Sequence, residues 1–254
     1  MLLNPANLKS IADRFQELTT QLLEADTASP SSWQDPSQSP ALLAEAMRKV
    51  LQLLELLETP DSSPAHSTAE SQQHTSHDIH ELGDYGFNLL ADLSSLAGEL
   101  RQEALSHDLE ALSLPLAIWI ARQGGELSTL EPIVNALAKQ ANTIREPLEL
   151  ERLYELTGEI QHALTPLLRK DLEKSNPGRP WRILLLNRAI IATRSHRPEV
   201  IEAAYENLLV HLPEEAAQFF RQGMEQMVAL DYPQPVRQVV ERYYNLWSVE
   251  HTLH

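Results

Sequence analysis

The chain has 254 residues, no cysteine, and 36 Asp and Glu against 20 Lys and Arg, which gives a net charge of −16. Without cysteine it forms neither a disulfide nor a thiolate nucleophile, and its negative charge argues against nucleic acid or an anionic membrane as a partner. The first residues lack the basic and apolar regions of a signal peptide, and no stretch approaches the roughly 18 apolar residues of a membrane span, so we expect a cytoplasmic protein.

Residues 1–59 predict an N-terminal helical hairpin. Apolar residues at helical spacing indicate a first helix from Leu8 to about Ala25. A segment rich in Ser and Pro follows, and a leucine-rich helix then runs from Leu42 to Leu57. We interpret this second helix as half of the hairpin core rather than as a dimerising coiled coil, because its heptad pattern is too short to be diagnostic.

The next segment, residues 60–76, has few apolar side chains and many Ser, Thr, Gln and His. Such a composition buries too little apolar surface to offset the entropy lost on ordering. We therefore predict a flexible linker that separates the hairpin from a helical repeat domain at residues 77–254.

Eight prolines in this domain form two interleaved series, each with a step of about 33 residues. Proline is tolerated in a helix chiefly in the first turn, so each one predicts a helix start. The two series are Pro115, Pro147, Pro180 and Pro213, and Pro132, Pro166, Pro198 and Pro233. A helical hairpin of this length has no core of its own and packs on its neighbours. The predicted fold is all-α, a right-handed α/α superhelix of antiparallel helix pairs that follows the N-terminal hairpin.

Three local patterns refine this prediction. The helix after Pro180 is apolar around almost its whole circumference, so we expect it to pack on several sides. The last helix, residues 236–247, has a single apolar stripe and a polar opposite face, which suits the end of a stack. Gly124 and Gly125 are explained as the C-cap and turn that end a helix.

The repeat length and the sequence Trp181-x-x-Leu184 resemble tetratricopeptide-like repeats, whose pattern begins W-x-x-L-G-x-x-Y. The period matches over about residues 115–250, but Leu185 and Arg188 stand where the family has Gly and Tyr. The resemblance implies a curved stack of antiparallel helices whose inner surface holds a peptide or another protein.

Residues 166–200 are the basic part of this acidic chain, with eight Lys and Arg against three Asp and Glu. The candidate groove residues in this segment are Arg182, Asn187, Arg188 and Arg194. Either the arginines pair inside the molecule with the Glu-rich helix 146–159, which we favour, or they bind an acidic peptide or carboxylate.

The predicted function is therefore a non-enzymatic interaction or scaffold module that binds a protein or an acidic peptide in a solenoid groove. Self-association as a homodimer is a further alternative, because solenoid flanks often expose apolar strips. The glycine-rich nucleotide motifs and the G-x-S-x-G nucleophile motif are missing from the sequence, so we expect neither catalytic residues nor a cofactor.

The alternative function is that of a metal-dependent phosphohydrolase. His80, the pair His107-Asp108 and the distant Asp171 resemble the ligand set of the all-helical HD-type enzymes. That resemblance implies one or two metal ions that generate hydroxide for attack on phosphorus. The pair His107-Asp108 also fits a solvated helix face between core leucines.

A second polar cluster begins the repeat domain. On one helix its members would share about 120° of arc, as a metal site requires. They are His74, His77, His80, Glu81 and Asp84. His80 to Asp84 begins like the zinc motif H-E-x-x-H, but Asp84 replaces the second histidine, so we interpret the cluster as the hydrated start of a helix.

Overall fold

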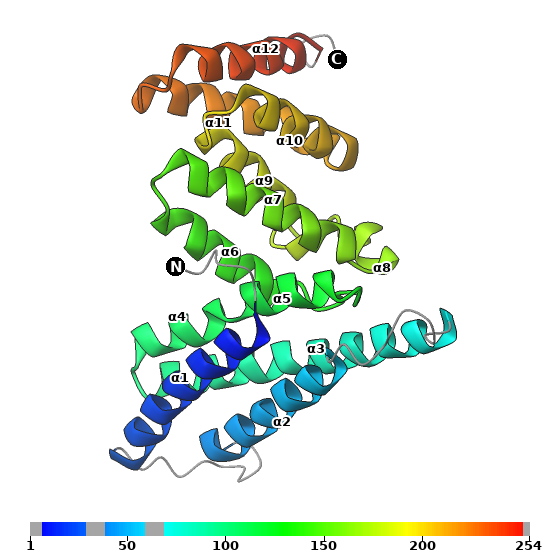
Figure 1. Cartoon of the computed structure of the whole chain (residues 1–254). Helices are drawn as coiled ribbons and strands as arrows, with labels where there is room; N and C mark the ends of the chain where they lie inside the picture. The colour runs from blue at the N-terminus through cyan, green and yellow to red at the C-terminus, as the bar shows by residue number, and fades with distance from the viewer. Residues whose placement is uncertain (1–6, 29–38, 59–68, 251–254) are drawn as a thin grey trace. The chain divides into compact units, whose positions relative to one another are not determined.

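The computed structural model describes residues 7–28, 39–58 and 69–250, and within these ranges it is built from helices without a β-strand (Figure 1). An isolated backbone bridge pairs Leu127 with Leu164. The prediction of an all-α protein is confirmed. Across the described ranges, we find no helix that combines the length and the apolar character needed to cross a bilayer.

The chain forms two compact units. Unit 1 comprises Met1–Gln140 and Leu156–Leu172, and unit 2 comprises Ala141–Glu155 and Glu173–His254. Their charges differ, because unit 1 has 22 Asp and Glu against nine Lys and Arg, whereas unit 2 has 14 against 11. The excess negative charge of the chain therefore belongs mostly to unit 1, with −13 of the total −16.

In the described ranges, unit 1 contains α1 (Leu8–Ala28), α2 (Pro40–Glu58), α3 (Ala69–Glu99), α4 (Glu103–Ala111) and α5 (Ser113–Arg122). It also holds most of α6 (Glu131–Thr143), the second half of α7 (Pro147–Ala163) and the one-turn helix α8 (Pro166–Arg169). Helix α1 packs on α2, α4 and α5, and α3 packs on α2, α4 and α5. The N-terminal hairpin is thus docked within unit 1.

The predicted linker is partly helical. Helix α3 begins at Ala69, inside the range 60–76, and residues 60–68 lie outside the described part of the chain. The compact units also divide the chain at places other than the predicted domain boundaries. The physical reason is that α3 packs along α2, which joins the hairpin to the helices that follow.

The core of unit 1 is formed by large side chains from α1, α2, α3 and α5. Phe15, Met47 and Phe87 are fully buried, and Trp119 is 2% exposed. The Nε1 of Trp119 donates a hydrogen bond to Glu58 Oε1 at 3.3 Å, which satisfies the polar atom of this buried ring. The inner face of α2 lies in this core, as expected for half of a hairpin; it consists of Ala44, Met47, Val50, Leu51 and Leu54.

Unit 2 contains the first half of α7, then α9 (Pro180–Arg194), α10 (Pro198–His211), the 3₁₀ turn η2 (Pro213–Glu215), α11 (Ala216–Ala229) and α12 (Gln234–Glu250). Helix α9 packs on α10, α11 packs on α12, and α10 also packs on α12. An aromatic cluster joins α10, α11 and α12, because the Tyr205 ring lies 5.0 Å from Phe220 and 5.1 Å from Tyr243 between centroids.

The eight periodic prolines all mark helix starts, as predicted. Four of them open α7, α8, α9 and α10, and Pro213 opens the turn that leads into α11. Pro115 and Pro132 lie in the first turns of α5 and α6, and Pro233 immediately precedes α12. Helix α8 is the exception in length, because it ends at Arg169 and is followed by turns up to Arg179. Pro177 and Gly178 in that segment disfavour a continuing helix.

Helix α12 has the exposure pattern that the sequence predicts, whereas α9 is buried over a wide face but not around almost its whole circumference, since Ile190 is 44% exposed. The buried residues of α9 cover about 200° of its circumference at 100° per residue. On α12 the apolar stripe is buried, with Val236 and Val240 at 0% exposure, whereas Arg237, Gln238 and Glu241 are exposed.

The end of α5 is a Schellman motif. Gly124 has a φ of 77°, and its N–H bonds to the carbonyl of Ala121, while the N–H of Gly125 bonds to the carbonyl of Ile120. A Cβ at position 124 would meet no atom closer than Ser76 Oγ at 3.8 Å, so any cost of a side chain there is one of backbone conformation.

We predict that Gly124→Ala lowers the free energy of unfolding by about 1 kcal/mol, because a left-handed φ is strained for alanine. The matched control is Gly98→Ala in the last turn of α3, where φ is not positive and the nearest neighbour of a new Cβ is 4.0 Å away. That change should be neutral or raise stability by up to about 1 kcal/mol. Urea denaturation followed by circular dichroism measures both, and equal effects would contradict the prediction.

Candidate functional site

The predicted groove residues all lie on α9, in unit 2, and the arginines among them bind groups of their own unit. Arg182 pairs with Glu215 of η2 through two hydrogen bonds, one of them from Nη2 at 2.7 Å, and its Nη1 donates to the carbonyl of Pro177 at 2.9 Å. The two-point contact with Glu215 lowers the pKa of that carboxyl. The charge of Arg182 is therefore already balanced within the protein.

Arg188 is buried against the first half of α7. Its guanidinium carbon lies 4.5 Å from the centre of the Tyr154 ring, and its Nη1 donates to the carbonyl of Tyr154 at 3.2 Å. Burial lowers the pKa of Arg188, and the contact with Tyr154 opposes that shift. At 8% exposure this side chain is a core contact rather than part of a surface groove.

Arg194 binds the C-terminal end of α6. Its Nη1 donates to the carbonyl of Ala141 at 2.7 Å, and its Nη2 donates to the carbonyl of Ile144 at 2.8 Å. Carbonyls at the end of a helix have no partner in the helix itself, and a cation there also complements the helix dipole. The fourth predicted residue, Asn187, is half-buried, and in the described part of the chain its Nδ2 has no hydrogen-bond partner.

The arginines of the basic segment thus form contacts largely inside the protein, but most of these contacts are not with the glutamates of helix α7. Arg197 does lie 3.8 Å from Glu151 of that helix. Arg179 instead contacts Glu214 at 3.3 Å and donates to the carbonyls of Lys174 and Asn176. Backbone carbonyls take up much of the donor capacity of these arginines.

The four residues of the alternative metal site are not brought together. His107 is exposed on α4, and the adjacent Asp108 pairs with Arg14 at 2.6 Å. Asp171 lies in the turn after α8 with a φ of 48°. Over the described ranges, no group of three or more His, Asp or Glu side chains is arranged to hold a metal ion.

The predicted hydrated helix start lies further along, inside α3, where His80 and Asp84, with side chains 23% and 21% exposed, hold the loop between α5 and α6. Asp84 accepts hydrogen bonds from the Ser128 hydroxyl and from the backbone N–H of Thr129 at 3.0 Å. His80 Nδ1 lies 2.9 Å from the carbonyl of Glu126. The sequence H-E-L-G-D therefore positions a loop of unit 1.

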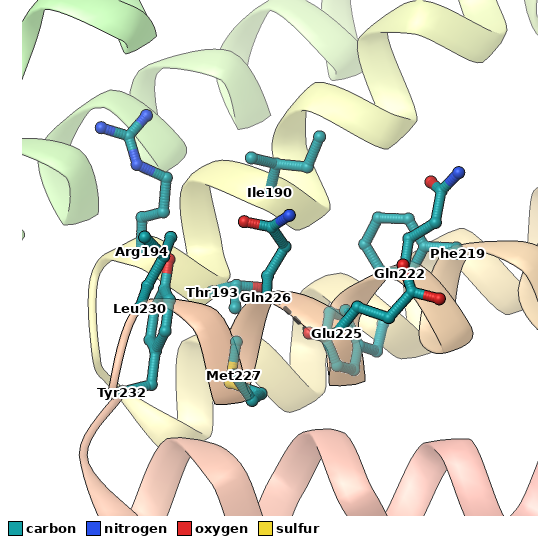
Figure 2. Close-up of a pocket in the computed structure, with 12 residues that line it drawn as sticks. Ile190, Thr193, Arg194, Phe219, Gln222, Glu225, Gln226, Met227, Leu230 and Tyr232 are labelled. Atoms are coloured by element: carbon teal, nitrogen blue, oxygen red, sulfur yellow. Dashed lines mark hydrogen bonds between the residues drawn. The ribbon is translucent and has the colours of Figure 1, made fainter.

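A cavity of about 520 Å³ opens beside α9 in unit 2 (Figure 2). Its walls come from α9, α10, α11 and the turn before α12. They are formed by Ile190, Thr193, Arg194, Tyr205, Phe219, Gln222, Gly223, Glu225, Gln226, Met227, Leu230 and Tyr232. Figure 2 shows Arg194, Leu230 and Tyr232 on one side of the cavity and Phe219 and Gln222 on the other, with Gln226 between them.

The inner wall of the cavity includes the buried and hydrogen-bonded Thr193 and Tyr205, and its rim is polar. Thr193 donates to the carbonyl of Ala189 at 2.8 Å, and its hydroxyl oxygen lies 2.8 Å from that of Tyr205. Burial raises the pKa of Tyr205, which keeps this hydroxyl neutral. At the mouth, Gln222 and Gln226 are exposed and one helical turn apart on α11. Such a cavity suits a ligand that buries an apolar group inside it and forms hydrogen bonds at the rim through the adjacent polar groups of the same ligand.

Arg194 belongs both to the predicted groove and to the cavity, whereas the residues of α11 are missed by sequence reasoning. Their signal in the sequence is weak, because glutamines on a helix face are ordinary surface residues. Gly223 is more informative, since a side chain there would bring its Cβ within 3.3 Å of Val240. No protein-family model, no curated protein and no solved structure matches this chain.

We predict that Arg194→Ala lowers the free energy of unfolding of unit 2 by about 1 to 3 kcal/mol, because the carbonyls of Ala141 and Ile144 lose a charged donor. Arg221→Ala, which removes an exposed arginine from α11, is the control and should change stability by less than about 0.5 kcal/mol. Urea denaturation compares the two variants. Equal stability would show that the contact contributes nothing.

A second prediction concerns pH. Because the pKa of Glu215 is lowered in the folded state, its contact with Arg182 stabilises the protein above the pKa of the unfolded carboxyl and is lost as the pH falls through the folded value. Glu215→Gln should therefore reduce stability by about 1 kcal/mol near pH 7, and the difference should shrink as the pH falls below about 4.5 and vanish below the folded pKa of Glu215. Thermal unfolding from neutral to acid pH measures this, with the exposed Glu241→Gln as control. A pH-independent difference would contradict it.

Proposed function

We propose that this protein is a non-enzymatic interaction module whose helix pairs form a right-handed α/α superhelix, and that it binds a peptide segment of a partner protein in the cavity beside α9. The regular helix starts and the packing of α9 on α10 and of α11 on α12 support the repeat architecture. Stacked helix pairs present extended surfaces that suit peptide binding.

The observation that carries the proposal is the chemistry of the cavity. Its volume of about 520 Å³ lies in the usual range for ligand sites and accommodates one or two large side chains. Ile190, Phe219 and Met227 provide an apolar wall for such an anchor. The amide groups of Gln222 and Gln226 at the rim both donate and accept, which suits the backbone of a bound peptide.

The internal contacts of the arginines change the ligand that we propose. An acidic peptide would have to compete with Glu215 for Arg182 and with two helix carbonyls for Arg194. A peptide with an apolar anchor does not have to break these contacts, because its affinity comes from moving the apolar side chain out of water. The proposed ligand is therefore a peptide with an exposed large apolar side chain.

We predict that Ile190→Glu weakens peptide binding about 30-fold or more, because it places a charge on the apolar wall. Peptides selected on the wild-type protein from a random displayed library provide the ligand, and fluorescence anisotropy measures the affinity. Val210→Glu replaces a more exposed apolar residue, 76% against 44%, away from the cavity and should bind as the wild type does. The proposal fails if no peptide with an apolar anchor is selected, or if both variants bind equally.

A further inference from the structure

Helix α2 carries a second apolar stripe on its outer face, in addition to the one buried in the core of unit 1. Leu42, Leu53 and Leu56 are 54%, 47% and 68% exposed. With 100° of rotation per residue, the three lie within about 60° of one another, on the side opposite to Met47 and Leu54. A surface helix normally presents one apolar stripe, so this second one needs a separate explanation.

The outer stripe has the spacing of a coiled-coil seam, and it is separate from the inner face that forms half of the hairpin core. The positions follow alternating steps of four and three residues, the pattern of the a and d positions of a heptad. They are Leu42, Ala46, Lys49, Leu53 and Leu56. Lys49, with 67% of its side chain exposed, is the single charged residue of the five.

The spacing of the seam residues is nearly the same when α2 is read in either direction from Lys49. If a second copy of α2 lies antiparallel with the two Lys49 residues opposite each other, Leu42 of one copy meets Leu56 of the other. Ala46 then meets Leu53, so that a small side chain packs against a large one. A parallel pair would instead leave Ala46 against Ala46 and a gap in the seam.

The two edges of the seam favour the same orientation. One edge carries the half-buried Leu43 and Leu57, and the other carries Glu45 and Gln52. In an antiparallel pair each edge faces the same edge of the second copy, so leucine meets leucine and Gln52 meets Glu45, whose carboxylate already contacts Arg48 and Lys49 of its own helix. In a parallel pair the polar edge would face the apolar one.

We infer that the protein self-associates through the outer face of α2, which pairs antiparallel with the same face of a second copy around a two-fold axis. Such a contact is isologous, because each copy contributes the same residues. The inference does not depend on the cavity beside α9. Each Lys49 lies 3.8 Å from Glu45 of its own helix, but two facing ammonium groups in the seam still cost free energy, which limits the affinity and allows the pair to exchange. One helix face is a small interface, so we expect a dissociation constant on the order of 10 μM.

Sedimentation velocity of the full chain from about 1 to about 200 μM tests the inference. The wild type should shift from monomer to dimer, and Leu42→Glu/Leu53→Glu should stay monomeric throughout. The matched control is Leu167→Glu/Leu172→Glu, which replaces two exposed leucines of unit 1 outside α2 and should dimerise as the wild type does. A wild type that is monomeric at every concentration, or a control that loses dimerisation as well, overturns the inference.

Lys49→Leu should strengthen dimerisation, in contrast to the glutamate substitutions. Replacing the charged layer of the seam by an apolar one should tighten dimerisation by about tenfold or more, with no loss of folded structure by circular dichroism. The same change at the exposed Glu55, on another face of α2, should leave the dissociation constant unchanged. Equal tightening by Lys49→Leu and Glu55→Leu would show that added apolar surface acts without regard to the seam, and would overturn the inference.

The chain has no cysteine, so introduced thiols report the orientation directly. We mix Ala46→Cys chains with Leu53→Cys chains of different mass and bridge the thiols with a short bis-maleimide. An antiparallel pair should yield mainly crosslinks between unlike chains. Predominant crosslinks between like chains would overturn the antiparallel arrangement.

Discussion

The structure depends on how the ends of its helices are fixed. At the start, a proline in or next to the first turn sets the backbone angle of a helix and removes an N–H that would have no partner there. At the other end, arginines donate to carbonyls that the helix leaves open, as Arg194 does after α6 and Arg169 does at the end of α7, where it contacts the carbonyls of His162 and Leu164. These constraints set where individual helices begin and end, although the helices range in length from four residues in α8 to 31 in α3.

The sequence predicts helix starts well because proline acts locally. A fixed φ and a missing N–H have the same effect whatever the tertiary packing, so all eight periodic prolines are confirmed at helix starts. The short length of α8 is harder to predict, because it depends on packing as well as on the later Pro177 and Gly178, and Leu172, just after the helix, is 73% exposed. Docking of the N-terminal hairpin is of the same kind, because it includes contacts of α1 with α4 and α5, which are distant from it in sequence.

The candidate site was less predictable, since charge patterns identify charged residues but not their partners. Arg182 and Glu215 are 33 residues apart, and Arg194 binds carbonyls that any sequence provides. Only the fold brings such groups together. The cavity combines glutamines and apolar residues of α11 with Ile190, Thr193 and Arg194 of α9, and none of these residue types is unusual on a helix. Arg188 is a candidate binding residue in the sequence, but in the structure it is buried and packs on Tyr154.

The uneven division of charge between the units has a consequence for how the protein responds to its ionic surroundings. Like charges on one compact body repel one another and favour expanded states, and dissolved ions shield that repulsion over about 10 Å at 0.1 M. Unit 1, with most of the surplus carboxylates, gains from this shielding, whereas the almost balanced unit 2 gains little. Added potassium chloride is therefore expected to raise the melting temperature of unit 1 more than that of unit 2, although both belong to one chain.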